Sequence, residues 1–174
     1  MNSINPEASH MGKKYILSSD NAMMKLRRMA FEILERNNGI PSICIAGIKE
    51  NGFVVAQVLT SILKEISPLQ VNLIEINIDK SNLLHCTITE DISVKDQVLV
   101  VVDDVVNSGK TMLYSILPFL PLSPKHIQTL TLVERSYKTF PVHVDYVGIS
   151  LATTLRDNIC VEVVDGNLMG AYVE

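Results

Sequence analysis

Two adjacent carboxylates at the end of a long apolar run constrain this chain more than any other feature. Residues 98–102 are five consecutive apolar residues, and Asp103 and Asp104 follow them directly. A run of this kind predicts a strand buried on both faces, as in a parallel sheet. The alternative is an ordinary buried strand that ends in an acidic turn.

The loop that follows the carboxylates has the composition of a phosphate site. After two valines come Asn107, Ser108, Gly109, Lys110 and Thr111. Glycine permits a tight turn, backbone N–H groups at the start of a following helix can cradle a phosphate, and the hydroxyls add donors. The two carboxylates can grip a diol or hold Mg²⁺. A Walker motif is excluded, because it needs a glycine six residues before the lysine, where Asp104 stands.

Helical spacing and apolar runs alternate along the rest of the chain. The first predicted helix begins at a cap within residues 18–20 and ends at 37–39. Two more are predicted over 53–66 and 110–117, and a proline-rich loop at 118–124 follows the last of them. Strands are predicted at 43–46, 71–78, 84–89, 98–102, 127–133 and 146–149, with short edge elements at 158–164 and 171–173. This order predicts an α/β fold with a mostly parallel, twisted sheet flanked by helices. Ligands in such sheets bind at the carboxyl ends of the strands.

The composition is that of a globular protein. The chain has 174 residues, of which 47% are hydrophobic and 20% charged, so we expect one domain over residues 14–174. We expect residues 1–13 to be a disordered or cloning-derived segment. A net charge of −4 gives no general affinity for polyanions. The three cysteines lack the spacing of a metal site, and the chain has neither an apolar stretch of roughly 20 residues nor a signal-peptide core. We therefore expect a cytoplasmic protein with no membrane partner.

The segment from Val98 to Thr111 resembles the phosphoribosyl-pyrophosphate (PRPP) signature of the type I phosphoribosyltransferases. The resemblance covers nearly the whole chain from about Lys14 and is greatest to the pyrimidine operon attenuation regulators, which also have uracil phosphoribosyltransferase activity. It is carried by residues 16–37, 47–52, 75–78, 132–135, 140–142 and 145–148. It implies the type I phosphoribosyltransferase fold, with a small hood beside the main sheet, and a homodimer.

The resemblance also implies a role for each site residue. Asp103 and Asp104 would be the catalytic pair that holds the ribose hydroxyls, and residues 107–111 would bind the 5-phosphate. The pyrophosphate loop would comprise Lys49, Glu50, Asn51 and Gly52. Val133 and Arg135 would lie in the base pocket. Mg²⁺ would arrive with PRPP as the cofactor, without a direct protein site unless Asp103 contributes one ligand.

Three departures from the subfamily pattern bear on activity. Asn51 replaces an arginine that would clamp a phosphate with two hydrogen bonds, and Glu50 adds a negative charge beside an anion site. The segment 79–97 is short for a lid that closes over the substrate, and its cations are Lys80 and Lys95. Asn107 stands where purine-type relatives carry an aspartate that accepts a proton, which favours a pyrimidine base.

The sequence therefore predicts an enzyme of nucleotide metabolism that salvages a pyrimidine such as uracil by Mg²⁺-dependent phosphoribosyl transfer. The alternative is a regulator that senses PRPP or a nucleotide without catalysis. RNA attenuation is a third and less favoured hypothesis, because RNA affinity depends on phosphate neutralisation and this chain is acidic.

Overall fold

The computed structural model describes residues 13–79, 81–89, 93–152 and 158–174. Most of the predicted N-terminal segment, as well as Lys80, therefore lies outside the described residues. The elements, in chain order, are β1 Lys14–Ser18, α1 Ser19–Arg36, β2 Ser42–Ile48, α2 Asn51–Ile66, β3 Gln70–Ile78, β4 Cys86–Ile88, β5 Val98–Val106, α3 Lys110–Ile116, the 3₁₀ helix η1 Leu117–Leu122, β6 His126–Arg135, β7 Tyr146–Leu151, β8 Ile159–Val164 and β9 Asn167–Val173.

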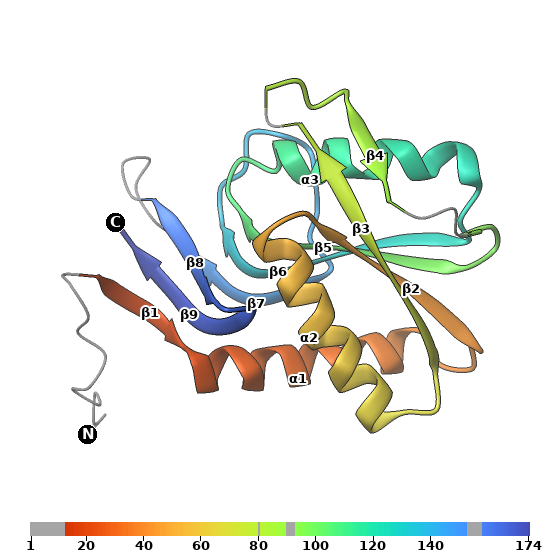
Figure 1. Cartoon of the computed structure of the whole chain (residues 1–174), viewed down its shortest axis with the longest axis horizontal. Coiled ribbons are helices and arrows are strands. Elements are labelled where there is room, and N and C mark those ends of the chain that lie inside the picture. The colour runs from red at the N-terminus through yellow and green to blue at the C-terminus, as the bar shows by residue number, and fades with distance from the viewer. Residues whose placement is uncertain (1–12, 80, 90–92, 153–157) are drawn as a thin grey trace.

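The main sheet has six strands in the order β4-β3-β2-β5-β6-β7. Neighbouring strands are parallel except that the short β4 runs antiparallel to β3, which confirms the predicted mostly parallel sheet. The chain adds β3 on one side of β2 and then returns to add β5, β6 and β7 on the other side (Figure 1). The order thus reverses between β2 and β5, and a crevice for ligands opens at such a switch point.

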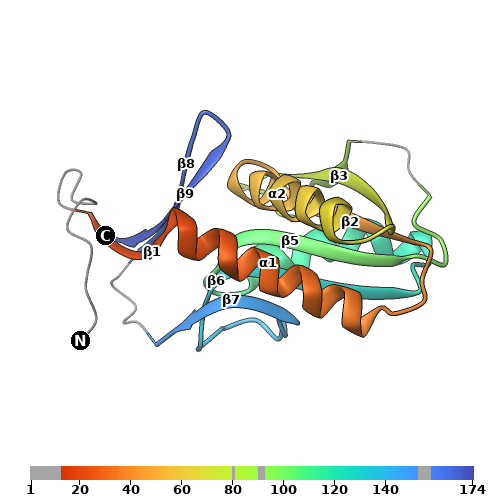
Figure 2. The same cartoon turned by 90° about the horizontal axis from the view of Figure 1, so that it is seen from below.

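Helices cover both faces of this sheet, so its central strand is buried on both sides. In β5, Val98, Val100 and Val102 pack into the core beneath α1 and α2, whereas Leu99 and Val101 pack into the core beneath α3 and η1. Figure 1 shows α3 across the sheet from α1 and α2, and Figure 2 shows those two helices from their own side. The apolar run at 98–102 was therefore interpreted correctly.

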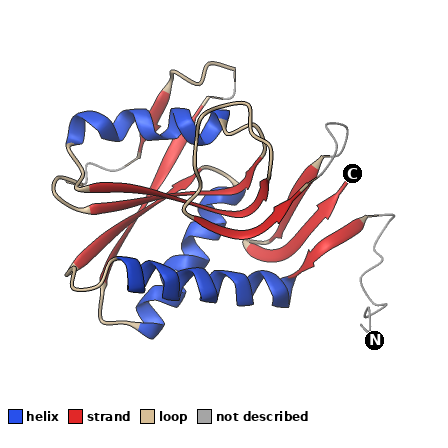
Figure 3. Cartoon of the chain, turned by 180° about the vertical axis from the view of Figure 1, so that it is seen from behind, coloured by secondary structure: helices blue, strands red, loops and turns tan. Residues whose placement is uncertain are grey.

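A second, smaller sheet stands beside the main one. It has the antiparallel order β1-β9-β8, and Figure 3 shows it as a separate group of strands next to one end of α1. We call these three strands the hood. β8 and β9 correspond to the two predicted edge elements. β1 was not predicted, because it pairs with β9 at the far end of the chain, with Lys14 opposite Val173.

Two connections differ from the predicted ones. The connection between the strand predicted at 43–46 and the helix predicted over 53–66 is reduced to two residues, because β2 continues to Ile48 and α2 begins at Asn51. The proline-rich segment after α3 is not an open loop but the 3₁₀ helix η1, which places Pro118 in its first turn. Within the described residues, each helix is too short or too polar to span a membrane.

Candidate functional site

The loops after β2 and β5 flank one cavity at the carboxyl end of the sheet. They are brought together by the parallel pairing of the two strands, in which Gly47 lies opposite Val102. The cavity has a volume of about 360 Å³. Its lining comes from the end of β2 and the start of α2, from β3, from β5 through the start of α3, and from the hood. The lining residues are, in that order, Ile48, Lys49, Glu50 and Asn51; Ile78; Asp103, Asp104, Val105, Asn107 and Thr111; and Ile159, Cys160 and Val161.

A smaller cavity adjoins the first on the α3 side. Its volume is about 70 Å³, and it shares Asp103, Val105, Asn107 and Thr111 with the large cavity. All five residues of the predicted phosphate loop line it. The structure thus brings together the predicted carboxylate pair, phosphate loop and pyrophosphate loop, with the exception of Gly52, which lies behind the cavity wall.

The two carboxylates belong to β5 itself rather than to a loop beyond it. Asp103 is 7% exposed, and its Oδ1 accepts a hydrogen bond of 2.9 Å from the backbone N–H of Asp104. The hydroxyl of Thr131 on β6 donates to the backbone carbonyl of Asp104 at 3.1 Å. These contacts hold the pair at a fixed place in the cavity wall.

Gly109 allows the phosphate loop to fold tightly against the connection between β6 and β7. Its φ of 82° is left-handed, and a Cβ there would lie 2.7 Å from Cγ1 of Val142. The carbonyl of Ser108 accepts hydrogen bonds from the backbone N–H groups of Thr139 and Phe140, at 3.1 and 3.0 Å. The loop is therefore held against this connection, as a preformed phosphate site requires.

Lys49 and Lys110 are the cations of the predicted pyrophosphate and phosphate loops, and their side chains lie in different surroundings. Lys49 is exposed at the rim of the large cavity, where its backbone N–H donates to the carbonyl of Ile76 at 2.8 Å. Lys110 holds its ammonium 5.9 Å from the centre of the Phe140 ring, which is within the range of a cation–π contact.

Asn51 connects the turn after β2 to the hood. Its Nδ2 donates a hydrogen bond of 2.9 Å to the carbonyl of Val161 on β8. Sequence reasoning missed this contact, along with the contributions of Ile78 and of β8 to the cavity, because no local pattern links positions 110 residues apart. The preceding residue, Glu50, has a φ of 73°, which is unusual for a residue other than glycine.

Val133 and Arg135, the predicted base-pocket residues, lie beside the cavity rather than in its lining. Val133 is fully buried in the core and pairs with Val105 and Ile149 of the neighbouring strands. Arg135 is the last residue of β6. Their role with a base remains a prediction.

The residues present can contribute ligands to Mg²⁺ but do not enclose it. Among the described residues, no cluster of three or more histidine, cysteine or acidic side chains could hold a metal ion. Asp103 and Asp104 offer hard oxygen ligands, which Mg²⁺ prefers, while it commonly takes its remaining ligands from substrate phosphates and water. This donor set fits an ion that arrives with an anionic substrate.

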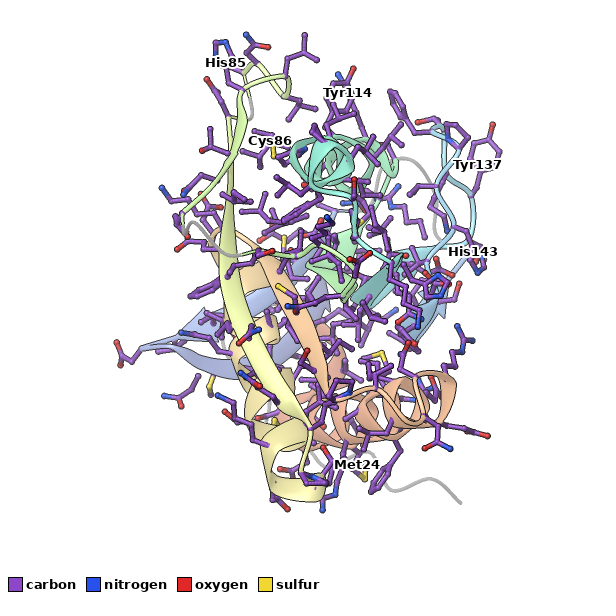
Figure 4. The ribbon with its side chains drawn as sticks, turned by 90° about the vertical axis from the view of Figure 1, so that its right-hand side faces the viewer. Met24, His85, Cys86, Tyr114, Tyr137 and His143 are labelled. Carbon is purple, nitrogen blue, oxygen red and sulfur yellow. The ribbon has the colours of Figure 1, made fainter. Side chains whose placement is uncertain are left out.

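The three histidines among the described residues stand apart from the site. His85 and His143 are exposed at separate places on the surface (Figure 4). His126 is the first residue of β6, at the opposite end of that strand from Arg135. None of the three lines either cavity.

Comparison with known proteins agrees with this geometry. The sequence profile of the phosphoribosyl transferase domain matches residues 13–163. The chain is 34% identical over 164 residues to the bifunctional protein PyrR of Clostridium acetobutylicum, a match that covers 88% of this chain and 92% of that protein. It is 30% identical over 179 residues to the PyrR of Bacillus pumilus, covering 94% of this chain and 99% of that protein.

Solved structures support the fold. The hypoxanthine phosphoribosyltransferase of Trypanosoma cruzi superposes with a TM-score of 0.70 at 14% identity, covering 79% of this chain and 81% of that one. A hypoxanthine-guanine phosphoribosyltransferase of Bacillus anthracis superposes with a TM-score of 0.67 at 20% identity, covering 80% and 82% of the two chains.

Proposed function

The chain belongs to the type I phosphoribosyltransferase family, and on this basis we propose that it binds PRPP with Mg²⁺ and transfers the phosphoribosyl group to a pyrimidine base such as uracil. The observation that supports this most is the junction of the two cavities. The phosphate loop lines the small one, Asp103 lines both, and Asp104 lines the large one. A ribose 5-phosphate moiety has the size and the groups to occupy both.

In the proposed reaction, the base nitrogen bonds to C1 of the ribose as the bond from C1 to the pyrophosphate oxygen breaks, and the proton of that nitrogen passes to the departing pyrophosphate or to water. Residues 107–111 hold the 5-phosphate, and Asp103 and Asp104 hold the hydroxyls of the ribose. Their negative charge also stabilises the positive charge that develops on the sugar ring in the transition state. Mg²⁺, when bound, would neutralise the charge of the departing pyrophosphate.

Asn107 favours a pyrimidine as the acceptor base. It lines both cavities beside the carboxylates, and its neutral amide cannot take a proton from a purine nitrogen. The match to the PyrR proteins, which resemble this chain over nearly its whole length, supports the same choice.

The experiment is a turnover assay with PRPP and Mg²⁺ against uracil, hypoxanthine, guanine, adenine and orotate in parallel. We expect a nucleotide product with uracil and a much slower reaction with the purines. If PRPP binds but none of the five bases reacts, the enzyme proposal fails and the sensing alternative stands.

That alternative, a protein that binds PRPP or a nucleotide without catalysis, is favoured by the turn after β2. The Asn51 amide donates to Val161 in the hood, and Glu50 stands at the rim of the cavity. A pyrophosphate group would meet these two residues where a catalyst needs cations.

RNA binding by a homodimer is a further regulatory proposal, suggested by the match to PyrR proteins. On α1, however, Arg27 pairs with Glu65 at 3.0 Å and Arg28 pairs with Glu32, so acidic neighbours offset these charges. Contacts to RNA phosphates weaken steeply between roughly 50 and 200 mM salt. An RNA affinity that does not change over this range would count against RNA binding. Sedimentation velocity tests the dimer.

A further inference from the structure

We propose that two copies of this chain associate through the outer side of α1, with Phe31 of each copy bound in a cavity where α1 and α2 of the other copy end. This names a contact surface for the homodimer proposed above. It does not depend on which ligand the PRPP site binds.

An apolar stripe lies on the exposed side of α1. Met23, Met24 and Phe31 are 40%, 63% and 53% exposed, and Figure 4 shows Met24 at the outer margin of the molecule. Met24, Arg27 and Phe31 follow one another at spacings of three and four residues, so their side chains lie along one face of the helix. Single exposed apolar side chains are common on protein surfaces, but three on one short helical surface indicate a contact with another molecule.

A cavity separate from the PRPP site opens on the same surface. Its volume is about 370 Å³, and it is lined by Leu34 of α1, by residues 37–41 after α1 and by residues 67–69 after α2. The described residues of this lining are all uncharged. Figures 1 and 2 show that α1 and α2 end on the same side of the molecule. Because Leu34 lies one turn beyond Phe31, the exposed ring and the cavity are neighbours on one surface.

The cavity has the walls that an aromatic ring favours. Ile40 and Leu69 are half-buried and contribute apolar surface to it. The residues that end the two helices, Asn37 and Ser67, also line it, and the carbonyl groups at a helix C-terminus carry a partial negative charge. The edge of an aromatic ring is partially positive, so a phenyl ring would find both apolar and electrostatic partners there.

The charge beside Phe31 suits the same place. The guanidinium carbon of Arg27 lies 6.0 Å from the centre of the Phe31 ring, and one of its nitrogens pairs with Glu65 of α2 at 3.0 Å. Cations are stabilised near the C-termini of helices. Entry of Phe31 into the cavity of a second copy would bring Arg27 toward two such termini, so the two surfaces are complementary in charge as well as in shape.

One surface carries both the projecting side chain and the cavity that can receive it, which favours a second copy as the partner. In a two-fold symmetric interface both copies contribute the same patch, so two contacts between Phe31 and a cavity form at once and the assembly closes. Met23 and Met24 would lie beside these contacts, where flexible thioether side chains adapt to the partner surface. A different protein would have to supply both a matching side chain and a matching cavity of its own.

Sedimentation velocity of the full chain between roughly 1 and 100 µM tests the proposal. The wild type should sediment as a dimer in the upper part of this range. Phe31→Asp should raise the dissociation constant of the dimer roughly 100-fold or more, because symmetry removes the contact twice. Tyr137→Asp is the matched control and should leave the dissociation constant unchanged. It introduces the same charge at an aromatic residue that is 76% exposed on another part of the surface (Figure 4).

Asn38→Trp alters the other half of the contact. Asn38 is exposed and lines the cavity, so a larger side chain there should exclude Phe31 of the partner and also weaken the dimer. An equimolar mixture of Phe31→Asp and Asn38→Trp should associate more tightly than either variant alone, because Phe31 of the second variant can enter the open cavity of the first. Thermal melting verifies that each variant folds.

A wild type that remains monomeric at about 100 µM overturns the proposal and leaves the surface of α1 to a different protein. A dimer that persists unchanged in both Phe31→Asp and Asn38→Trp overturns this interface while the homodimer stands. A mixture that associates no more tightly than the separate variants also overturns it. None of these results bears on PRPP binding, so the proposed transferase activity is tested independently.

Discussion

A Cβ atom on Gly52 would lie 3.1 Å from Oδ1 of Asp103 and 3.2 Å from its Cα. The first turn of α2 therefore packs directly against the part of β5 that carries the carboxylates. This contact sets the distance between the two loops that share the large cavity. Gly52, which does not line the cavity, therefore acts on its shape through Asp103.

Gly52→Ala should weaken binding more than it weakens the fold. The added methyl group must displace α2 from Asp103 by a few tenths of an ångström, and overpacking of this kind typically costs about 1–3 kcal/mol. The higher helix propensity of alanine offsets about 1 kcal/mol of that loss. Because small displacements at a site cost much affinity, we expect PRPP and nucleotide affinity to fall roughly fivefold or more by calorimetry.

Gly166→Ala is the control for this variant. A Cβ there meets nothing within 4 Å, but the φ of 76° disfavours alanine, so stability should fall while affinity does not. Equal affinity losses in the two variants would show that the contact between Gly52 and Asp103 does not position the site.

Asn51→Ala should loosen the hood. Removal of the hydrogen bond to Val161 should cost about 1 kcal/mol, which corresponds to roughly fivefold faster amide hydrogen exchange in β8. Asn38→Ala, at an exposed turn after α1, is the control and should leave exchange in β8 unchanged. If β8 exchanges at the wild-type rate in Asn51→Ala, the tie between the turn and the hood contributes nothing measurable.

Cys86 should be a slow thiol whose reactivity rises with pH. Its side chain packs against the core beneath α3 (Figure 4), and burial raises the pKa of the thiol from 9.0 to about 11. At pH 8 the thiolate fraction is then on the order of 0.1%, so iodoacetamide should modify Cys86 slowly and about tenfold faster per pH unit. Peptide mass spectrometry measures this rate, and rapid modification at pH 8 would contradict the burial of the thiol.

The same pKa shift links Cys86 to stability. Between pH 9 and about 11 the unfolded chain has lost the thiol proton while the folded chain retains it. The free energy of unfolding should therefore fall as pH rises through this window. Cys86→Ser should show a smaller decrease over the same range, and parallel curves for the two proteins would contradict the shift.

The sequence was most informative where local pattern and fold agree. The run at 98–102 predicted a strand buried on both faces, and alternate residues of β5 do enter two different cores. The polar residues after it predicted a phosphate loop, and all five line the small cavity. These features follow from side-chain periodicity and turn chemistry within one short segment.

The rest depended on contacts between distant segments. The pairing of β1 with β9, the bond from Asn51 to Val161 and the lining of the large cavity by Ile78 and β8 join positions that no local pattern connects. The length of β5 was also underestimated, because carboxylates usually mark the end of a strand. Here Asp103 and Val105 continue the ladder with Thr131 and Val133 of β6.

The most direct test of the account is calorimetric titration of the wild-type protein and Asp104→Asn with PRPP and Mg²⁺. We predict saturable binding to the wild type, lost on chelation of Mg²⁺, and affinity lower by roughly 10- to 100-fold in Asp104→Asn, as expected for a hydrogen bond to a charged group. Glu35→Gln should bind as the wild type does. The absence of detectable heat from the wild type at millimolar PRPP, or equal affinity in Asp104→Asn, would contradict the assignment of β5 as the ribose site.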